Sequence, residues 1–173
     1  MDEQVRSSVV LVDIDETVLE SLVRAATGEA ADDVTPPLTP GGTWTPERVD
    51  WLRRLHRHCR AGLSGPERQA TWAITHNGRV VGAVRLKRTG DPGALETGIW
   101  LTRDERGHGV AAAAIAAVLD KAGELGAREV RADTTTGNAA ALSLLHRSGF
   151  ELSPAENGQD VQAVRRLHYA GMV

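Results

Sequence analysis

Hydrophobic and polar positions along this chain repeat in two ways, one typical of β-strands and one typical of amphipathic helices. Apolar residues at every second position predict strands, whereas apolar residues spaced three or four apart predict helices. The strands predicted in this way cover residues 8–14, 71–75, 79–87, 95–101, 128–134, 150–152 and 163–169. The predicted helices cover residues 16–26, 45–60, 110–125 and 139–148. Their alternation along a chain of 173 residues indicates a single α/β domain, residues 1–173.

Local signals mark several boundaries of these elements. Thr45 is suited to cap the second helix with its hydroxyl, and Pro46 fits the first helical turn. Asn77-Gly78, between two alternating segments, predicts a two-residue hairpin turn. Gly126 and Gly149 are expected to end the two later helices.

Residues 27–44 are predicted to form a long loop, because the stretch contains three prolines and several glycines. A loop of this length is typical of a substrate-side segment rather than of a passive connection. Asp32 and Asp33 are expected to attract a cationic acceptor, and Trp44 is a candidate for contacting it.

Composition and charge limit the classes of function. No apolar run is long enough to cross a bilayer, and a net charge of −3 argues against general nucleic-acid binding while it suits a cationic substrate. The single cysteine, Cys59, cannot form an intrachain disulfide, and the charged N-terminus lacks a signal-peptide core, so a cytoplasmic location is expected. No pattern predicts a metal site or a hydrolase nucleophile. We expect no membrane or nucleic-acid partner, and a monomer or homodimer.

The most informative stretch runs from Glu96 to Ala111, where a short strand, a turn rich in glycine and an alanine-rich helix follow one another. A helix start presents unpaired backbone N–H groups and the positive end of the helix dipole, and glycines let a bulky anion approach them. The stretch therefore predicts binding of a phosphate or pyrophosphate. No lysine follows in the P-loop position, and Gly107, Gly109 and Ala112 match a dinucleotide fingerprint only in part.

Arg106-Gly-His-Gly-Val-Ala111 resembles the acyl-CoA pyrophosphate loop, Arg/Gln-x-x-Gly-x-Gly/Ala, of the GNAT N-acetyltransferases. The segment from Asn138 to Phe150 resembles a second motif of that family, in which an asparagine opens a helix ending in Gly-Phe. The similarity points to the RimJ/RimL-like branch, which also holds antibiotic-acetylating enzymes. It implies the GNAT fold, with a central mixed, mostly antiparallel twisted sheet of six to seven strands flanked by about four helices. The acetyl-CoA-binding core is then expected at residues 96–153.

The resemblance also implies acetyl-CoA as cofactor and direct transfer of its acetyl group to an amine in a ternary complex. The residues expected at the coenzyme are Ile99, Trp100, Leu101, Thr102, Arg106, Gly107, His108, Gly109, Val110, Ala111 and Asn138. Glu96 is the candidate base for the amine and lies beside the acceptor, although a solvent-facing glutamate at a strand start is an equal alternative. Asn138, the other candidate catalytic residue, is expected near the pantetheine arm or the substrate, or as a plain helix cap.

The chain departs from the family pattern at Leu145, where many members carry a tyrosine as general acid for the departing thiolate. A thiolate can leave without such an acid, because its conjugate thiol has a pKa near 8–9. Departure from the tyrosine pattern is therefore compatible with an active N-acetyltransferase. Because the 27–44 loop is acidic and the net charge is −3, we expect a small cationic acceptor such as an aminoglycoside-type antibiotic, and thus a role in antibiotic resistance. A ribosomal-protein N-terminus is the alternative acceptor, and a non-catalytic acyl-CoA-binding module is a second alternative, motivated by Leu145.

Overall fold

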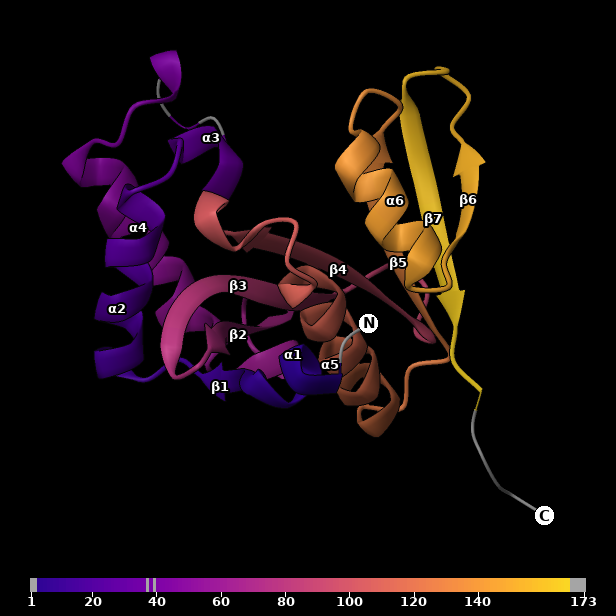
Figure 1. Ribbon diagram of the computed structural model, residues 1–173, viewed down its shortest axis with the longest axis horizontal. Coiled ribbons are helices and arrows are strands. Elements are labelled where there is room, and N and C mark those ends of the chain that lie inside the picture. Colours follow the sequence, from indigo (N-terminus) through magenta and orange to yellow (C-terminus); the bar gives the residue numbers. More distant parts are fainter. Residues whose placement is uncertain (1–2, 37, 39, 169–173) are drawn as a thin grey trace.

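A seven-stranded sheet forms the centre of the protein (Figure 1). The computed structural model describes residues 3–36, 38 and 40–168 of the chain. The strands are β1 (Val9–Asp13), β2 (Gln69–His76), β3 (Arg79–Arg88), β4 (Ala94–Leu101), β5 (Glu129–Thr135), β6 (Glu151–Pro154) and β7 (Asp160–Arg166). They lie in the order β1-β2-β3-β4-β5-β7-β6, and every neighbouring pair is antiparallel except β4 and β5.

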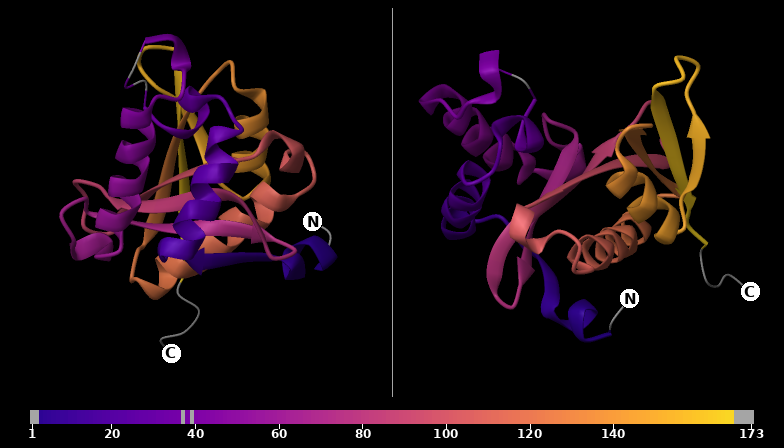
Figure 2. Two further views of the ribbon diagram at one scale, coloured as in Figure 1. Left: turned by 90° about the vertical axis from the view of Figure 1, so that its left-hand side faces the viewer. Right: turned by 45° about the horizontal axis from the view of Figure 1, so that its top comes forward.

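Helices cover both faces of this sheet. They are α1 (Glu3–Ser8), α2 (Glu16–Thr27), α3 (Ala31–Val34), α4 (Pro46–Cys59), α5 (Val110–Glu124) and α6 (Ala139–Arg147), with 3-10 turns η1 (Pro40–Gly42), η2 (Gly62–Ser64) and η3 (Arg103–Glu105). On one face, Leu22 of α2 and Leu52 of α4 form a core cluster with Ala83 of β3. On the other face, Ile115 of α5 packs in a second cluster with Val84, the next residue of β3. The helices α5 and α6 thus lie opposite α2 and α4 (Figures 1 and 2).

The sheet opens between β4 and β5. Backbone pairing of these strands covers only Ala94–Glu96 of β4 and Glu129–Arg131 of β5. Beyond Glu96 the two strands diverge, so that β5, β7 and β6 stand apart from the rest of the sheet (Figure 1). The opening leaves one edge of β4 without a strand partner from Thr97 onwards.

The register with β3 decides which backbone groups of β4 face this opening. The Thr102 amide donates to the Val81 carbonyl at 2.8 Å, and amides alternate in direction along a strand. The amides of Trp100 and Thr102 therefore point toward β3, whereas those of Ile99 and Leu101 point toward the opening.

The α/β architecture and the seven-stranded mixed sheet predicted from the sequence are confirmed, and the predicted boundaries agree to within a few residues. The Thr45 hydroxyl caps α4 by accepting from the Arg48 amide at 3.2 Å. Asn77 and Gly78 both have positive φ angles, 50° and 79°, as a tight hairpin turn requires. No helix in the described part of the chain is long and apolar enough to cross a membrane.

Two stretches differ from the prediction. The sequence does not predict α1, whose six residues include Val5 as the one apolar side chain and therefore show no helical period. The segment 27–44 is not a featureless loop, because α3 and η1 lie within it. The predicted end of the last strand, at Tyr169, lies outside the described residues.

Candidate active site

The turn before α5 has the geometry of an anion site. Gly107 and Gly109 adopt left-handed φ angles of 78° and 82°, which favour glycine. Gly109 is the N-cap residue of α5, and no side chain caps the helix there. The first N–H groups of the helix, from Val110 to Ala112, are thus left for an anion at the positive end of the helix dipole.

Arg106 ties this turn to its surroundings. Its Nε and Nη2 donate to the Leu101 carbonyl at 3.2 and 3.1 Å. Nη2 also lies 3.7 Å from Asp33 Oδ2 and 4.0 Å from Glu29 Oε2. Because Glu29 Oε1 accepts from the Arg103 amide at 3.0 Å, the segment around α3 is joined to the turn at two points.

Glu105 connects the turn before α5 to a different part of the sheet. Its side chain is 11% exposed, and its Oε2 lies 2.7 Å from Nδ1 of His76. Its Oε1 accepts from Nη2 of Arg79 at 2.6 Å. His76 and Arg79 flank the turn between β2 and β3, so the carboxylate links that hairpin to the anion site. This cluster is not predictable from the sequence, because only the fold brings these distant residues together.

Glu96 lies on the face of β4 that looks toward α2 and α4, and it is paired with an arginine. Its Oε1 accepts from Nη2 of Arg85 at 2.7 Å, and the two side chains are 32% and 37% exposed. Gly98 makes room for this pair, since a Cβ there would lie 2.7 Å from Arg85 Nε. Arg85 is not predictable from the sequence as part of the site, because its proximity to Glu96 depends on the register of β3 against β4.

A cavity of about 250 Å³ lies on this same face, between the sheet and the helices α3 and α4. Its apolar walls include Leu52, Leu55 and Trp100, and its polar groups are Asp33, His56, Gln69, Thr71 and Arg85. Burial, and to a smaller extent the charge of Arg60, lowers the pKa of the His56 imidazole to about 4. The cavity therefore has both apolar and polar walls. A neutral histidine, His56, and the Arg85 of the Arg85–Glu96 pair both line it.

The predicted acceptor residues of the 27–44 segment occupy different environments. Asp33 lines the cavity. Asp32 Oδ1 instead accepts from Nη2 of the fully buried Arg48 at 2.6 Å. The Trp44 indole donates to the Glu29 carbonyl at 2.8 Å, and its ring centroid lies 5.8 Å from Arg48 Cζ. In this structure, Asp32 and Trp44 hold the segment together around Arg48.

The second motif contributes a cap and an apolar contact. Asn138 Oδ1 accepts from the Ala141 amide at 3.1 Å and so caps α6. Leu145 is 6% exposed and packs in the core cluster beneath α5. His146 is exposed, as is His108 in the turn before α5.

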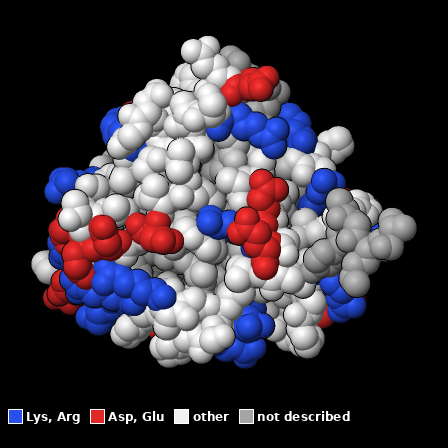
Figure 3. Space-filling view, turned by 90° about the horizontal axis from the view of Figure 1, so that it is seen from below, with Lys and Arg blue, Asp and Glu red and all other residues white. Residues whose placement is uncertain are grey.

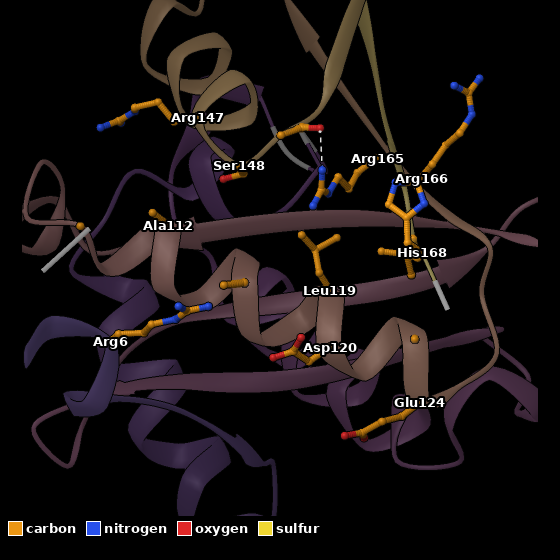
Figure 4. Close-up of a pocket in the computed structure, with 15 residues that line it drawn as sticks. Arg6, Ala112, Leu119, Asp120, Glu124, Arg147, Ser148, Arg165, Arg166 and His168 are labelled. Atoms are coloured by element: carbon orange, nitrogen blue, oxygen red, sulfur yellow. Dashed lines mark hydrogen bonds between the residues drawn. The ribbon is translucent and has the colours of Figure 1, made fainter. Parts of the chain in front are cut away.

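A groove of about 980 Å³ runs along α5 from the anion site, between that helix, the end of α6 and β7 (Figure 4). Ala112 and Ala116 line it on α5, and Arg6 and Arg147 line its margins. On the face seen from below, basic and acidic side chains form separate small groups rather than one continuous basic surface (Figure 3). Within the described residues, no group of histidine, cysteine and acidic side chains is arranged to hold a metal ion.

An uncapped helix start at a glycine turn lies beside the point where the parallel strands separate, and a cavity lies on the opposite face of β4. This arrangement is the one expected of an acetyl-CoA-dependent N-acetyltransferase. The family model of the acetyltransferase (GNAT) domain matches residues 11–151, and the chain belongs to that family. Its cofactor is accordingly acetyl-CoA.

Solved structures agree in fold at low sequence identity. The microcin C7 self-immunity acetyltransferase MccE, in complex with acetyl-CoA and AMP, is 14% identical over 95% of each chain, with a TM-score of 0.70. An acetyltransferase from Salmonella typhimurium that modifies the N-terminal serine of ribosomal protein L7/L12 is 15% identical, covers 94% of this chain and 96% of its own, and has a TM-score of 0.73. Mycobacterium smegmatis RimJ, with a CoA disulfide, is 18% identical over 91% and 81%, with a TM-score of 0.74. Among curated proteins, none matches the chain.

Proposed function

We propose that this protein acetylates the primary amine of a small cationic acceptor, such as an aminoglycoside-type antibiotic, by direct attack in a ternary complex. One observation carries the proposal: the opening between β4 and β5 lies between a helix start suited to pyrophosphate and a cavity lined by Asp33 and by Arg85, the ion-pair partner of Glu96. A coenzyme and an amine entering from these two sides would meet at β4.

On the coenzyme side, the N–H groups at the start of α5 would bind the pyrophosphate. Arg6 and Arg147, at the groove that begins beside Gly109, are placed to pair with further phosphate of the coenzyme. The thioester would then enter the opening, where the amide of Ile99 is directed. A backbone N–H in this position stabilises the negative charge that develops on the carbonyl oxygen during attack.

On the acceptor side, Asp33 and Glu96 would attract the ammonium group and Glu96 would accept its proton. Glu96 passes this proton to water, the neutral amine nitrogen forms a bond with the carbonyl carbon, and the carbon–sulfur bond breaks with its electron pair on sulfur. The nitrogen then loses its second proton to Glu96, which leaves a neutral amide. With Leu145 in an apolar core, no side chain is proposed to protonate the thiolate, which is a stable leaving group without one.

A protein N-terminus is a second candidate acceptor, and one observation favours it. A polar cavity of about 580 Å³ adjoins Glu96 on the exposed face of β5, β7 and β6, where an extended chain has room to lie. One of the structural neighbours, RimL, is also named as a ribosomal L7/L12 alpha-N-protein acetyltransferase.

The test is acetyl-CoA-dependent thiol release with a panel of aminoglycosides, polyamines and peptides with free N-termini. Release with aminoglycosides but not with neutral peptides supports the proposal, and the reverse result selects the protein N-terminus. Acetyl-CoA binding without release against any amine would instead support the non-catalytic module.

A further inference from the structure

The cavity beside Glu96 contains a polar pair that the proposed transfer step does not use. His56 of α4 and Thr71 of β2 both line it, and His56 Nδ1 lies 3.0 Å from Thr71 Oγ1. The His56 residue is 4% exposed, and the lowered pKa of its imidazole keeps the ring neutral at physiological pH. A buried neutral imidazole joined to a hydroxyl is thus part of the cavity wall.

A histidine–hydroxyl pair of this kind suits a ligand group that can both donate and accept a hydrogen bond. With Nδ1 engaged by Thr71, Nε2 is the ring nitrogen left for a molecule in the cavity. Nε2 accepts if Nδ1 carries the proton, and donates if Nδ1 accepts from the Thr71 hydroxyl. An alcohol matches either tautomer, whereas an ammonium can only donate and a carboxylate can only accept.

The charges around the pair act against a second ammonium group in this position. The charge of Arg60 contributes to the lowered pKa of His56, so its positive potential reaches the ring. Arg85 also lines the cavity and is the direct cross-strand partner of Thr71. A cation entering here would lose water next to the guanidinium of Arg85, whose counter-ion Glu96 does not line the cavity. A neutral polar group is therefore favoured over a charged one.

The sheet geometry separates this pair from the proposed reaction centre. Thr71 is paired with Arg85, and Arg85 with Gly98, so the three residues form a row across β2, β3 and β4. Because neighbouring strands lie about 4.8 Å apart, Thr71 is about 10 Å from Gly98 along this row. A group that contacts His56 and Thr71 must then lie several bonds from the amine that reacts at β4. Trp100, in the cavity wall, offers an apolar surface to the part in between.

We propose that the cavity receives a hydroxyl-bearing saturated ring of the acceptor, and that His56 and Thr71 determine specificity for that hydroxyl. The inference rests on the proposed transfer to a small amine and narrows its acceptor. Ring amino alcohols, the chemistry of amino sugars, should be preferred to polyamines of equal or greater charge.

The test compares four acceptors with one ring and one reacting amine: cyclohexylamine, trans-4-aminocyclohexanol, trans-1,4-diaminocyclohexane and trans-4-aminocyclohexanecarboxylate. In the wild-type protein, kcat/KM for the amino alcohol should exceed that for each of the others about tenfold, as one net hydrogen bond to a neutral group provides. Thr71→Val, which replaces the hydroxyl by a methyl group, should reduce this preference to within about threefold. His56→Phe should do the same.

Thr75→Val is the matched control, because Thr75 is on the same strand but its hydroxyl donates to the Val10 carbonyl at 3.0 Å, away from the cavity. Its substitution should leave the preference unchanged, and coenzyme A affinity should be equal in all variants. Equal rates with the four amines, or a preference for the diamine or the carboxylate, would overturn the inference. No thiol release with any of the four amines, while other amines react, would overturn it as well. No thiol release with any amine would instead overturn the proposed function.

Discussion

Replacement of Glu96 by glutamine tests the proposed proton transfer most directly. The glutamine side-chain oxygen can still accept from Arg85, so the local geometry at 2.7 Å should persist while the proton-accepting carboxylate is lost. A positioned general base contributes about 10²–10⁴-fold to a rate. Because one oxygen of the Glu96 carboxylate is already engaged by Arg85, we expect the lower end of this range, a fall in kcat of about 100-fold. That factor corresponds to about 2.7 kcal/mol in the activation free energy.

The assay for Glu96→Gln is steady-state thiol release with the acceptor that the panel identifies, together with calorimetric titration of coenzyme A. Coenzyme affinity should be unchanged, because Glu96 lies on the acceptor face of β4. Glu20→Gln is the matched control: Glu20 also accepts from an arginine, Arg53 at 3.0 Å, but on the surface between α2 and α4. A kcat within about threefold of wild type in Glu96→Gln would remove Glu96 from the mechanism.

Two further changes test the coenzyme side, and one measurement on the unaltered protein tests the burial of Cys59. Gly109→Val should weaken coenzyme A binding at least about 100-fold in a calorimetric titration, because it places a β-branched side chain at a φ of 82° where the backbone must approach an anion; retained affinity would undo the assignment of the turn. Glu105→Gln should raise the KM for acetyl-CoA about five- to tenfold with kcat nearly unchanged, since it removes the charge that holds Arg79 and His76, and a fall in kcat alone would contradict a role in positioning the turn. Burial raises the pKa of the Cys59 thiol to about 11, so the native protein should not react with a thiol reagent at pH 8 and should react once per chain after denaturation; a fast reaction of native protein would refute the burial.

The elements of the fold are predictable from the sequence because their signals are local. The alternating apolar positions of β2 and β3, and the Asn77-Gly78 turn between the two strands, fall within about twenty consecutive residues. The anion site is equally local, since Gly107, Gly109 and the start of α5 at Val110 lie within four residues of the chain. Short-range patterns therefore give the sheet, its helices and one half of the candidate site.

The acceptor half is not predictable in this way, because it is built from contacts between distant residues. The sequence suggests Glu96 but not its partner Arg85, which is brought beside it by the pairing of Arg85 with Gly98. The same holds for His56, whose burial against Thr71 depends on the packing of α4 on β2. A periodic pattern can place a side chain on a face, but it cannot identify the side chain on the next strand that shares it.

The position of β4 explains why one strand can serve both substrates. Its alternation places Glu96, Gly98 and Trp100 on the face that carries the proposed acceptor cavity, while its free edge directs the amide of Ile99 into the opening. The second arrangement depends on the loss of pairing with β5 after Glu96. If that pairing continued, the Ile99 amide would be used by β5 and the opening would close. The end of a strand ladder, rather than any single side chain, thus creates the place where the two proposed substrates meet.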